Sequence, residues 1–220
     1  MSQQFTILFD LDGTIVDTAP DLISAHNHVM RKFGFQEKGL SEIKKLAGKG
    51  AWIMMQRSFK NQITDEIMKK KMVAEFLSFY SKNIDKKSKV IDGLVKFLEW
   101  AKKNNISMAV CTNKQENLAT DLLKKLSIYK YFEFVAGSDT FEFNKPDPRH
   151  LTNVVEIIKG DLKKTIMVGD SEVDEMSAAN AKIPFILIEN GYTEKKVSEM
   201  KYDYLIKDYN NFEEIISKLL

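Results

Sequence analysis

Acidic side chains gather directly after the first apolar segment of the chain, and their spacing suits metal-assisted chemistry. The run 5–9 is apolar apart from one threonine, and Asp10, Asp12 and Asp17 follow it. Carboxylates at the end of a buried strand repel one another and lose hydration, so a hard cation such as Mg²⁺ is the expected compensation. Gly13 frees the backbone to turn, which lets Asp10 and Asp12 face one pocket. The competing interpretation is a solvated acidic turn.

Three later segments carry side chains suited to phosphate chemistry. Thr112 and Asn113 precede a helical pattern, where a hydroxyl and free N–H groups form a phosphate cradle, although such a pair is also a common helix cap. Lys145 lies in a proline-rich turn that stiffens the backbone around its ammonium. Asp170 and Asp174 stand one helical turn apart, so both can face the first acids, although acids at a helix start also complement the macrodipole.

The elements that must position these residues alternate in type. From residue 90 onward, apolar runs typical of buried strands alternate with amphipathic patterns typical of helices. This order predicts an α/β, Rossmann-like core with a five-stranded parallel sheet and helices on both faces. Ligands of such sheets bind beyond the carboxyl ends of the strands, where the residues above lie. The expected strands are 5–9, 106–111, 132–136, 165–168 and 184–188, and the expected helices are 93–103, 115–126, 148–158, 172–181 and 211–219.

Residues 18–85 interrupt this alternation with helical patterns alone. Thr18 as a cap and Pro20 in the first turn predict a helix start, and Gly34 predicts its left-handed end. Further helices are expected at 41–47, 51–60 and 64–83, and the lysine-rich residues 85–89 are the expected return linker. We therefore expect a core of residues 1–17 and 86–220, and an inserted all-helical unit of residues 18–85, called the helical insertion below.

Composition excludes several classes of protein. The chain of 220 residues is 44% hydrophobic and 29% charged, with a net charge of +2, which indicates neither a nucleic-acid nor a membrane partner. Its one cysteine, Cys111, excludes an internal disulfide and is expected to be a buried thiol. No stretch approaches the roughly 20 apolar residues of a membrane helix. The first apolar run ends in acids, unlike a signal peptide, so we expect a cytoplasmic protein, either a monomer or a homodimer.

Four motifs in order resemble those of the haloacid dehalogenase superfamily of phosphotransferases. They are Asp10-Leu11-Asp12-Gly13-Thr14, Thr112-Asn113, Lys145-Pro146 and Gly169-Asp170 with Asp174. The helical insertion resembles the C1 cap of this superfamily, in its phosphoglycolate phosphatase and β-phosphoglucomutase branch. The Gly48-Lys49-Gly50 loop and the Gly191-Tyr192 turn are similar to the phosphoglycolate phosphatase side. The pair Ala181-Lys182 departs from the Ala-Gly found in many of these proteins.

The resemblance implies a covalent mechanism. Asp10 would attack phosphorus and form an aspartyl-phosphate, and Asp12 would protonate the leaving alcohol and then deprotonate the attacking water. Mg²⁺ would be held by Asp10, the main-chain carbonyl of Asp12 and Asp170. Asp174 would orient either Lys145 or a water molecule bound to the metal.

The resemblance also implies which residues bind the substrate. Lys145, Thr112 and Asn113 would hold the phosphoryl group. Gly48, Lys49 and Gly50 are the candidate specificity loop of the cap, where glycines let backbone and one cation approach a small anion, although a plain helix–helix turn explains them equally well. Arg57 is a weaker candidate. His26, His28 and His150 are interpreted as structural.

The function implied is a Mg²⁺-dependent phosphatase acting on a small phosphomonoester, with 2-phosphoglycolate as the leading candidate. A phosphomutase and an inorganic pyrophosphatase of the same fold use the same two aspartates and remain open. A signalling receiver domain is disfavoured, because its phosphoacceptor follows strand three and this chain has no such acid after Ala136. A haloalkanoic acid dehalogenase is disfavoured because it would not need Asp12.

Overall fold

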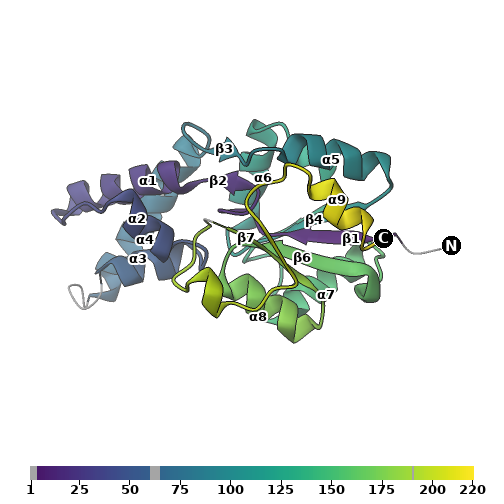
Figure 1. Cartoon of the computed structure of the whole chain (residues 1–220). Coiled ribbons are helices and arrows are strands. Elements are labelled where there is room, and N and C mark those ends of the chain that lie inside the picture. Colours follow the sequence, from purple (N-terminus) through teal and green to yellow (C-terminus); the bar gives the residue numbers. More distant parts are fainter. Residues whose placement is uncertain (1–3, 60–64, 190) are drawn as a thin grey trace.

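The centre of the computed structural model, which describes residues 4–59, 65–189 and 191–220, is a parallel sheet. Its order is β5-β4-β1-β6-β7-β8, so the chain adds strands first on one side of β1 and then on the other (Figure 1). Each adjacent pair is parallel. The strands are β1 (Thr6–Phe9), β4 (Ser107–Cys111), β5 (Phe134–Ala136), β6 (Thr165–Gly169), β7 (Phe185–Ile188) and β8 (Tyr204–Ile206).

The sheet has six strands, so the expectation of five was wrong in number. The unexpected strand is β8, which pairs in parallel with β7 at the edge. Its apolar run is only three residues long, between Asp203 and Lys207, and only Ile206 is buried, so the segment gives a weaker strand signal than the others. A second sheet of two short strands, β2 (Val16–Asp17) and β3 (Lys89–Val90), was also not expected.

Alternate residues of the strands face two separate apolar clusters. Ile7 and Phe9 of β1 pack with helices α5 (Leu94–Lys103), α6 (Glu116–Lys125) and α9 (Phe212–Ser217). Leu8, between them, packs with α7 (Pro148–Ile157) and α8 (Glu172–Ala181) on the other face (Figure 1). This period of two explains why β1 is apolar on both faces. Short 3₁₀ turns complete the core at Tyr129–Tyr131, Leu162–Lys164 and Val197–Glu199.

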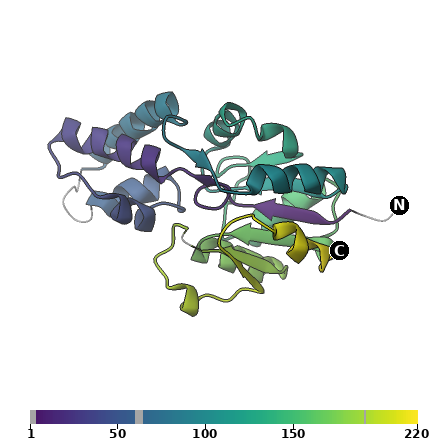
Figure 2. The same cartoon turned by 45° about the horizontal axis from the view of Figure 1, so that its top comes forward.

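The helical insertion contains α1 (Ala19–Phe33), α2 (Leu40–Leu46), α3 (Ala51–Phe59) and α4 (Glu66–Asn83), and the described part of residues 18–85 holds no strand. These helices lie together beyond the carboxyl end of β1 in both views (Figures 1 and 2). Gly34 ends α1 with φ 77°, as predicted. The expected helix ends at residues 60 and 64 lie outside the described residues.

The chain leaves and re-enters the core through the antiparallel pair of β2 and β3. The buried carboxylate of Asp21, in the first turn of α1, holds the returning chain through hydrogen bonds. It accepts hydrogen bonds from the backbone N–H groups of Lys87 and Ser88 and from the Ser88 hydroxyl. Residues 85–89, expected to be the return linker, are therefore held beside the start of α1.

None of the helices that the structure describes combines the length and apolar composition that crossing a bilayer requires.

Candidate active site

The polar strand ends meet at one edge of the sheet. Phe9 lies in register with Val110 of β4 and Val168 of β6, so the residues that follow these strands are neighbours. The backbone N–H of Asp10 continues the ladder by donating to the Val168 carbonyl at 2.9 Å. The structure brings together all seven side chains predicted for the core site, and each is buried: Asp10, Asp12, Thr112, Asn113, Lys145, Asp170 and Asp174.

The ammonium of Lys145 connects two of the acids. Its Nζ lies 2.8 Å from Asp10 Oδ1 and 2.6 Å from Asp174 Oδ1, and the residue is 3% exposed. Burial alone lowers the pKa of Lys145, but the two carboxylates outweigh burial and hold its pKa above the ordinary value. The cation at this position therefore stays charged.

The acids carry more negative charge than Lys145 neutralises. Oxygens of Asp10, Asp170 and Asp174 lie within 4.8 Å of one another. Burial raises the pKa of Asp10 to about 6, with Lys145 opposing the shift and Asp174 adding to it. Burial, together with Asp10 and Asp174, also raises the pKa of Asp170 well above its usual range. A hard cation would relieve this repulsion, so the oxygen donors present suit Mg²⁺.

Asp174 is oriented by the start of α8. Its Oδ2 accepts hydrogen bonds from the N–H groups of Asp170 and Ser171 and from the Ser171 hydroxyl, while Oδ1 accepts from Lys145. Through Oδ1, Asp174 holds the ammonium of Lys145 in place.

Asp170 is fixed by residues of the first motif and of the Gly191-Tyr192 turn, for which the sequence predicted no contact with it. Thr14 Oγ donates to its Oδ1 at 2.9 Å, and the N–H of Tyr192 donates to Oδ2. Gly13 has φ +83°, and a Cβ at this position would lie 2.4 Å from Asp170 Oδ2. The glycine is thus needed both for the turn and for the close approach of Asp170.

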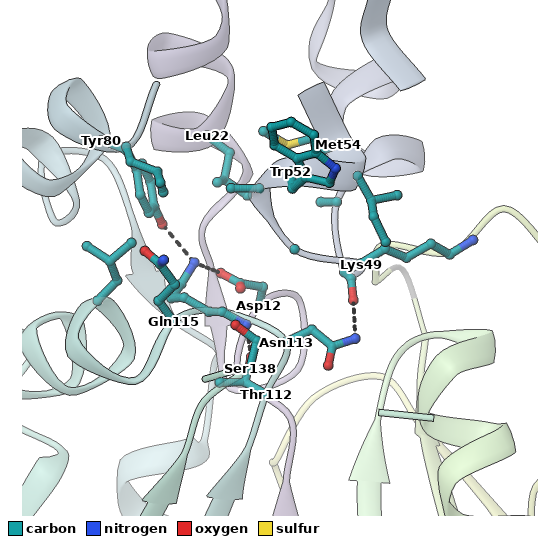
Figure 3. Close-up of a pocket in the computed structure, with 18 of the residues that line it drawn as sticks. Asp12, Leu22, Lys49, Trp52, Met54, Tyr80, Thr112, Asn113, Gln115 and Ser138 are labelled. Carbon is teal, nitrogen blue, oxygen red and sulfur yellow. Dashed lines mark hydrogen bonds and ion pairs between the residues drawn. The ribbon is translucent and has the colours of Figure 1, made fainter. Parts of the chain in front are cut away.

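Asp12 lies in a separate network that faces the helical insertion. Its Oδ1 accepts hydrogen bonds from Thr18 Oγ at 2.6 Å and from Lys114 Nζ at 2.8 Å. Lys114 also donates to the hydroxyl of Tyr80, on α4, at 3.2 Å (Figure 3). Thr18 precedes α1, but its side chain does not cap the helix as expected, because its hydroxyl is directed to Asp12.

A cavity of about 520 Å³ lies between the sheet end and the helical insertion. Its polar floor includes Asp10 and Asp12, whereas Lys145, Asp170 and Asp174 do not line it, so Asp10 connects the charge cluster to the cavity. The insertion contributes mostly apolar side chains, among them Leu22, Trp52, Met54, Val73, Phe76 and Leu77 (Figure 3). A cavity of this size suits a small molecule.

The loop predicted to set specificity does line this cavity. Asn113 Nδ2 donates to the carbonyls of Lys145 and Gly48, at 3.1 and 3.5 Å. The ammonium of Lys49, however, lies 2.7 Å from Glu172 and 3.2 Å from Glu194, and Figure 3 shows it directed away from Asp12. Arg57 also pairs with Glu194. In this conformation both cations join the insertion to the core.

The family of the chain follows from its sequence. Residues 7–188 match the model of the family described as haloacid dehalogenase-like hydrolase. The chain belongs to this family. The resemblance drawn from the four motifs is therefore confirmed, and the α/β fold with a parallel sheet agrees with it.

Two relatives match almost the whole chain. The phosphoglycolate phosphatase of Agrobacterium fabrum is 37% identical over 218 residues, covering 96% of this chain and 94% of that protein. The phosphoglycolate phosphatase of Mesorhizobium japonicum is 34% identical over 206 residues, covering 93% and 91%.

A solved structure shares the fold of this haloacid dehalogenase-like hydrolase. The crystal structure of a predicted phosphoglycolate phosphatase from Haemophilus somnus superposes with a TM-score of 0.90. The match covers 98% of this chain and 99% of that one at 23% sequence identity. At this identity the likeness concerns the fold alone.

The remaining sequence candidates have structural partners outside the cavity. His26 contacts Ser58, His28 contacts Glu75, and His150 contacts the Gly137 carbonyl. Cys111 is fully buried, and burial raises the pKa of its thiol to about 12. Lys114 and Tyr80 were missed because a lysine at a helix start and an aromatic in a helical stripe are typical of ordinary structural positions.

Proposed function

We propose that the chain is a Mg²⁺-dependent phosphatase that hydrolyses a small phosphomonoester, with 2-phosphoglycolate as the first candidate substrate. The observation that carries the proposal is the position of Asp10. It lies at the cavity floor with Lys145 at 2.8 Å and two further buried acids beside it. The names of the two relatives at 37% and 34% identity support the choice of substrate.

In the first half of the reaction, an Asp10 oxygen forms a bond to phosphorus. The bond from phosphorus to the alcohol oxygen breaks, and that oxygen keeps the electron pair and takes a proton from Asp12. In the second half, Asp12 removes a proton from water as the water oxygen attacks the aspartyl-phosphate and releases Asp10. Lys145, Thr112 and Asn113 bind the phosphoryl oxygens and stabilise their charge.

The residues that would hold Mg²⁺ are Asp10, Asp170 and the main-chain carbonyl of Asp12. When bound, the cation supplies positive charge that offsets the buried carboxylates and the phosphoryl oxygens. Asp174 orients Lys145 through Oδ1, while its Oδ2 is held by the Asp170 N–H and the Ser171 hydroxyl.

The helical insertion, residues 18–85, acts as the cap over this site. Its apolar side chains exclude water from the cavity while the ester is bound. The loop Gly48-Lys49-Gly50 is proposed to contact the end of the substrate away from the phosphate. A cytoplasmic setting is proposed because the one cysteine, Cys111, is a buried free thiol.

The test is phosphate release from a panel of esters by the purified protein, with Mg²⁺ or with EDTA. We expect release from 2-phosphoglycolate with Mg²⁺ and none with EDTA. Asp10→Asn should abolish turnover without unfolding the protein, whereas Asp121→Asn, at a partly exposed acid on α6, should change neither. Appreciable hydrolysis by Asp10→Asn would disprove the covalent mechanism. Release only from pyrophosphate, or isomerisation of β-glucose-1-phosphate, would replace the proposed substrate and reaction.

A further inference from the structure

Lys114 is a buried cation to which the four motifs assign no role. The residue is 9% exposed and follows directly after Thr112 and Asn113. Burying an ammonium is costly unless it is paired. Here the partners are Asp12 Oδ1 at 2.8 Å and the Tyr80 hydroxyl at 3.2 Å. Burial lowers the pKa of Lys114, but Asp12 and Tyr80 more than offset this effect, so the ammonium remains charged.

The contacts of Asp12 are unequal between its two oxygens. Oδ1 accepts from both Thr18 and Lys114. The side-chain contacts that Asp12 makes among the described residues are both on Oδ1, and Asp12 itself lines the cavity. Two fixed donors on one oxygen set the rotation of the carboxyl group and leave the other oxygen available to a ligand.

The partners of Lys114 come from both parts of the chain. Asp12 follows β1 of the core, whereas Tyr80 lies on α4 of the helical insertion and is 2% exposed. Figure 3 draws both contacts as dashed lines, one from the Tyr80 hydroxyl and one from the Asp12 carboxylate. The other lysine among the described cavity residues, Lys49, is engaged by Glu172 and Glu194. Of these two lysines, Lys114 is therefore the one that contacts a carboxylate of the cavity floor.

We propose that Lys114 is a positioning residue for Asp12, and that Tyr80 makes this positioning depend on the helical insertion. The inference rests on the proposed function, since it concerns the proton that Asp12 gives to the leaving alcohol. With Oδ1 held by two donors, Oδ2 is the oxygen from which the proposed proton transfer would take place. As the bond from phosphorus to the alcohol oxygen breaks, this proton moves to that oxygen, and the Asp12 carboxylate left behind is stabilised by the adjacent ammonium.

The test uses the dependence of kcat/KM on the leaving group, because this ratio covers the steps up to alcohol release. Three esters are compared: 2-phosphoglycolate, 2-hydroxyethyl phosphate, which has no carboxylate, and 4-nitrophenyl phosphate, whose leaving group needs no proton. Lys114→Met should lower kcat/KM about 100-fold for both alkyl esters and at most about tenfold for the aryl ester. Tyr80→Phe should show the same pattern with a loss of about tenfold for the alkyl esters.

The matched control is Lys124→Met. Lys124 lies over the ring of Tyr129 and, unlike Lys114, is on the surface. This substitution should leave all three values unchanged. A loss confined to 2-phosphoglycolate would overturn the proposal and make Lys114 a ligand of the substrate carboxylate. Equal losses for all three esters would overturn it in favour of a structural role.

If Lys114→Met does not fold, Tyr80→Phe keeps the lysine and supplies the same comparison. A wild-type protein that hydrolyses none of the three esters contradicts the proposed function. A wild-type protein that is active, with variants that lack the leaving-group pattern, contradicts only the positioning role.

Discussion

Lys145 Nζ lies 2.8 Å from Oδ1 of Asp10, so the proposed nucleophile has its counter-ion within the same buried cluster. The two residues are 135 positions apart in the sequence and meet because their strands end at the same edge of the sheet. In the proposed mechanism, the ammonium holds the attacking oxygen of Asp10 in place and binds the incoming phosphoryl group. Substrate binding and attack would then both depend on this side chain.

Removing that ammonium should damage both activity and stability. Lys145→Met leaves Asp10 and Asp174 without their cation, so we expect kcat to fall at least about 100-fold. The free energy of unfolding should fall by about 3 kcal/mol, because buried charges lose their partner. Steady-state kinetics and urea unfolding measure the two effects. Lys125→Met is the matched control, since Lys125 also bridges two aspartates but on the surface. It should cost less than about 1 kcal/mol and leave kcat unchanged.

The close approach of Gly13 to Asp170 yields a second prediction. Gly13→Ala imposes a strained φ and places a methyl group against the Asp170 carboxylate, so kcat/KM should fall about 100-fold through misplacement of that acid. Gly34→Ala shares the positive φ, but a Cβ there meets nothing within 4 Å. It should therefore cost about 1 kcal/mol of stability and no activity. Equal activities of the two variants would show that the position of Asp170 does not matter.

Acid should destabilise the protein partly through His150. Burial lowers the pKa of His150 from 6.5 to about 4 in the folded state, and among the described residues Nδ1 has no acceptor for a second proton. Between these pH values the unfolded chain binds more protons, so stability is lost as the pH falls, by at most about 3 kcal/mol from this group. Urea unfolding at pH 7.5 and pH 4.5 measures the loss. His150→Gln cannot take up this proton, so its loss should be smaller; an unchanged loss would exclude His150 as a contributor.

The parts of the site that the sequence predicts share one property. Asp10, Thr112 and Asp170 each follow an apolar run directly, so the strand and its polar end are visible in the same stretch of residues. Because parallel strands end at the same edge of the sheet, the topology alone places these residues close together. Lys145 was predicted through the family resemblance, since no apolar run leads directly to it.

Other features depend on contacts that no local pattern records. Strand β8 has one buried residue, Ile206, and exists because the edge of β7 is available for pairing. Tyr80 belongs to an apolar stripe of α4, and only the packing of α4 over the sheet end brings its hydroxyl to Lys114. Lys49 carries the positive charge expected of an anion ligand, but its ammonium forms ion pairs with Glu172 and Glu194.

The pairing of β2 with β3 has a consequence for the history of this architecture. Because the chain departs and returns at adjacent points, which Asp21 holds together, the segment between them can be lengthened, shortened or exchanged without rerouting any strand of the main sheet. Selection for a new substrate could then change the helical insertion while the carboxylates of the core keep their positions.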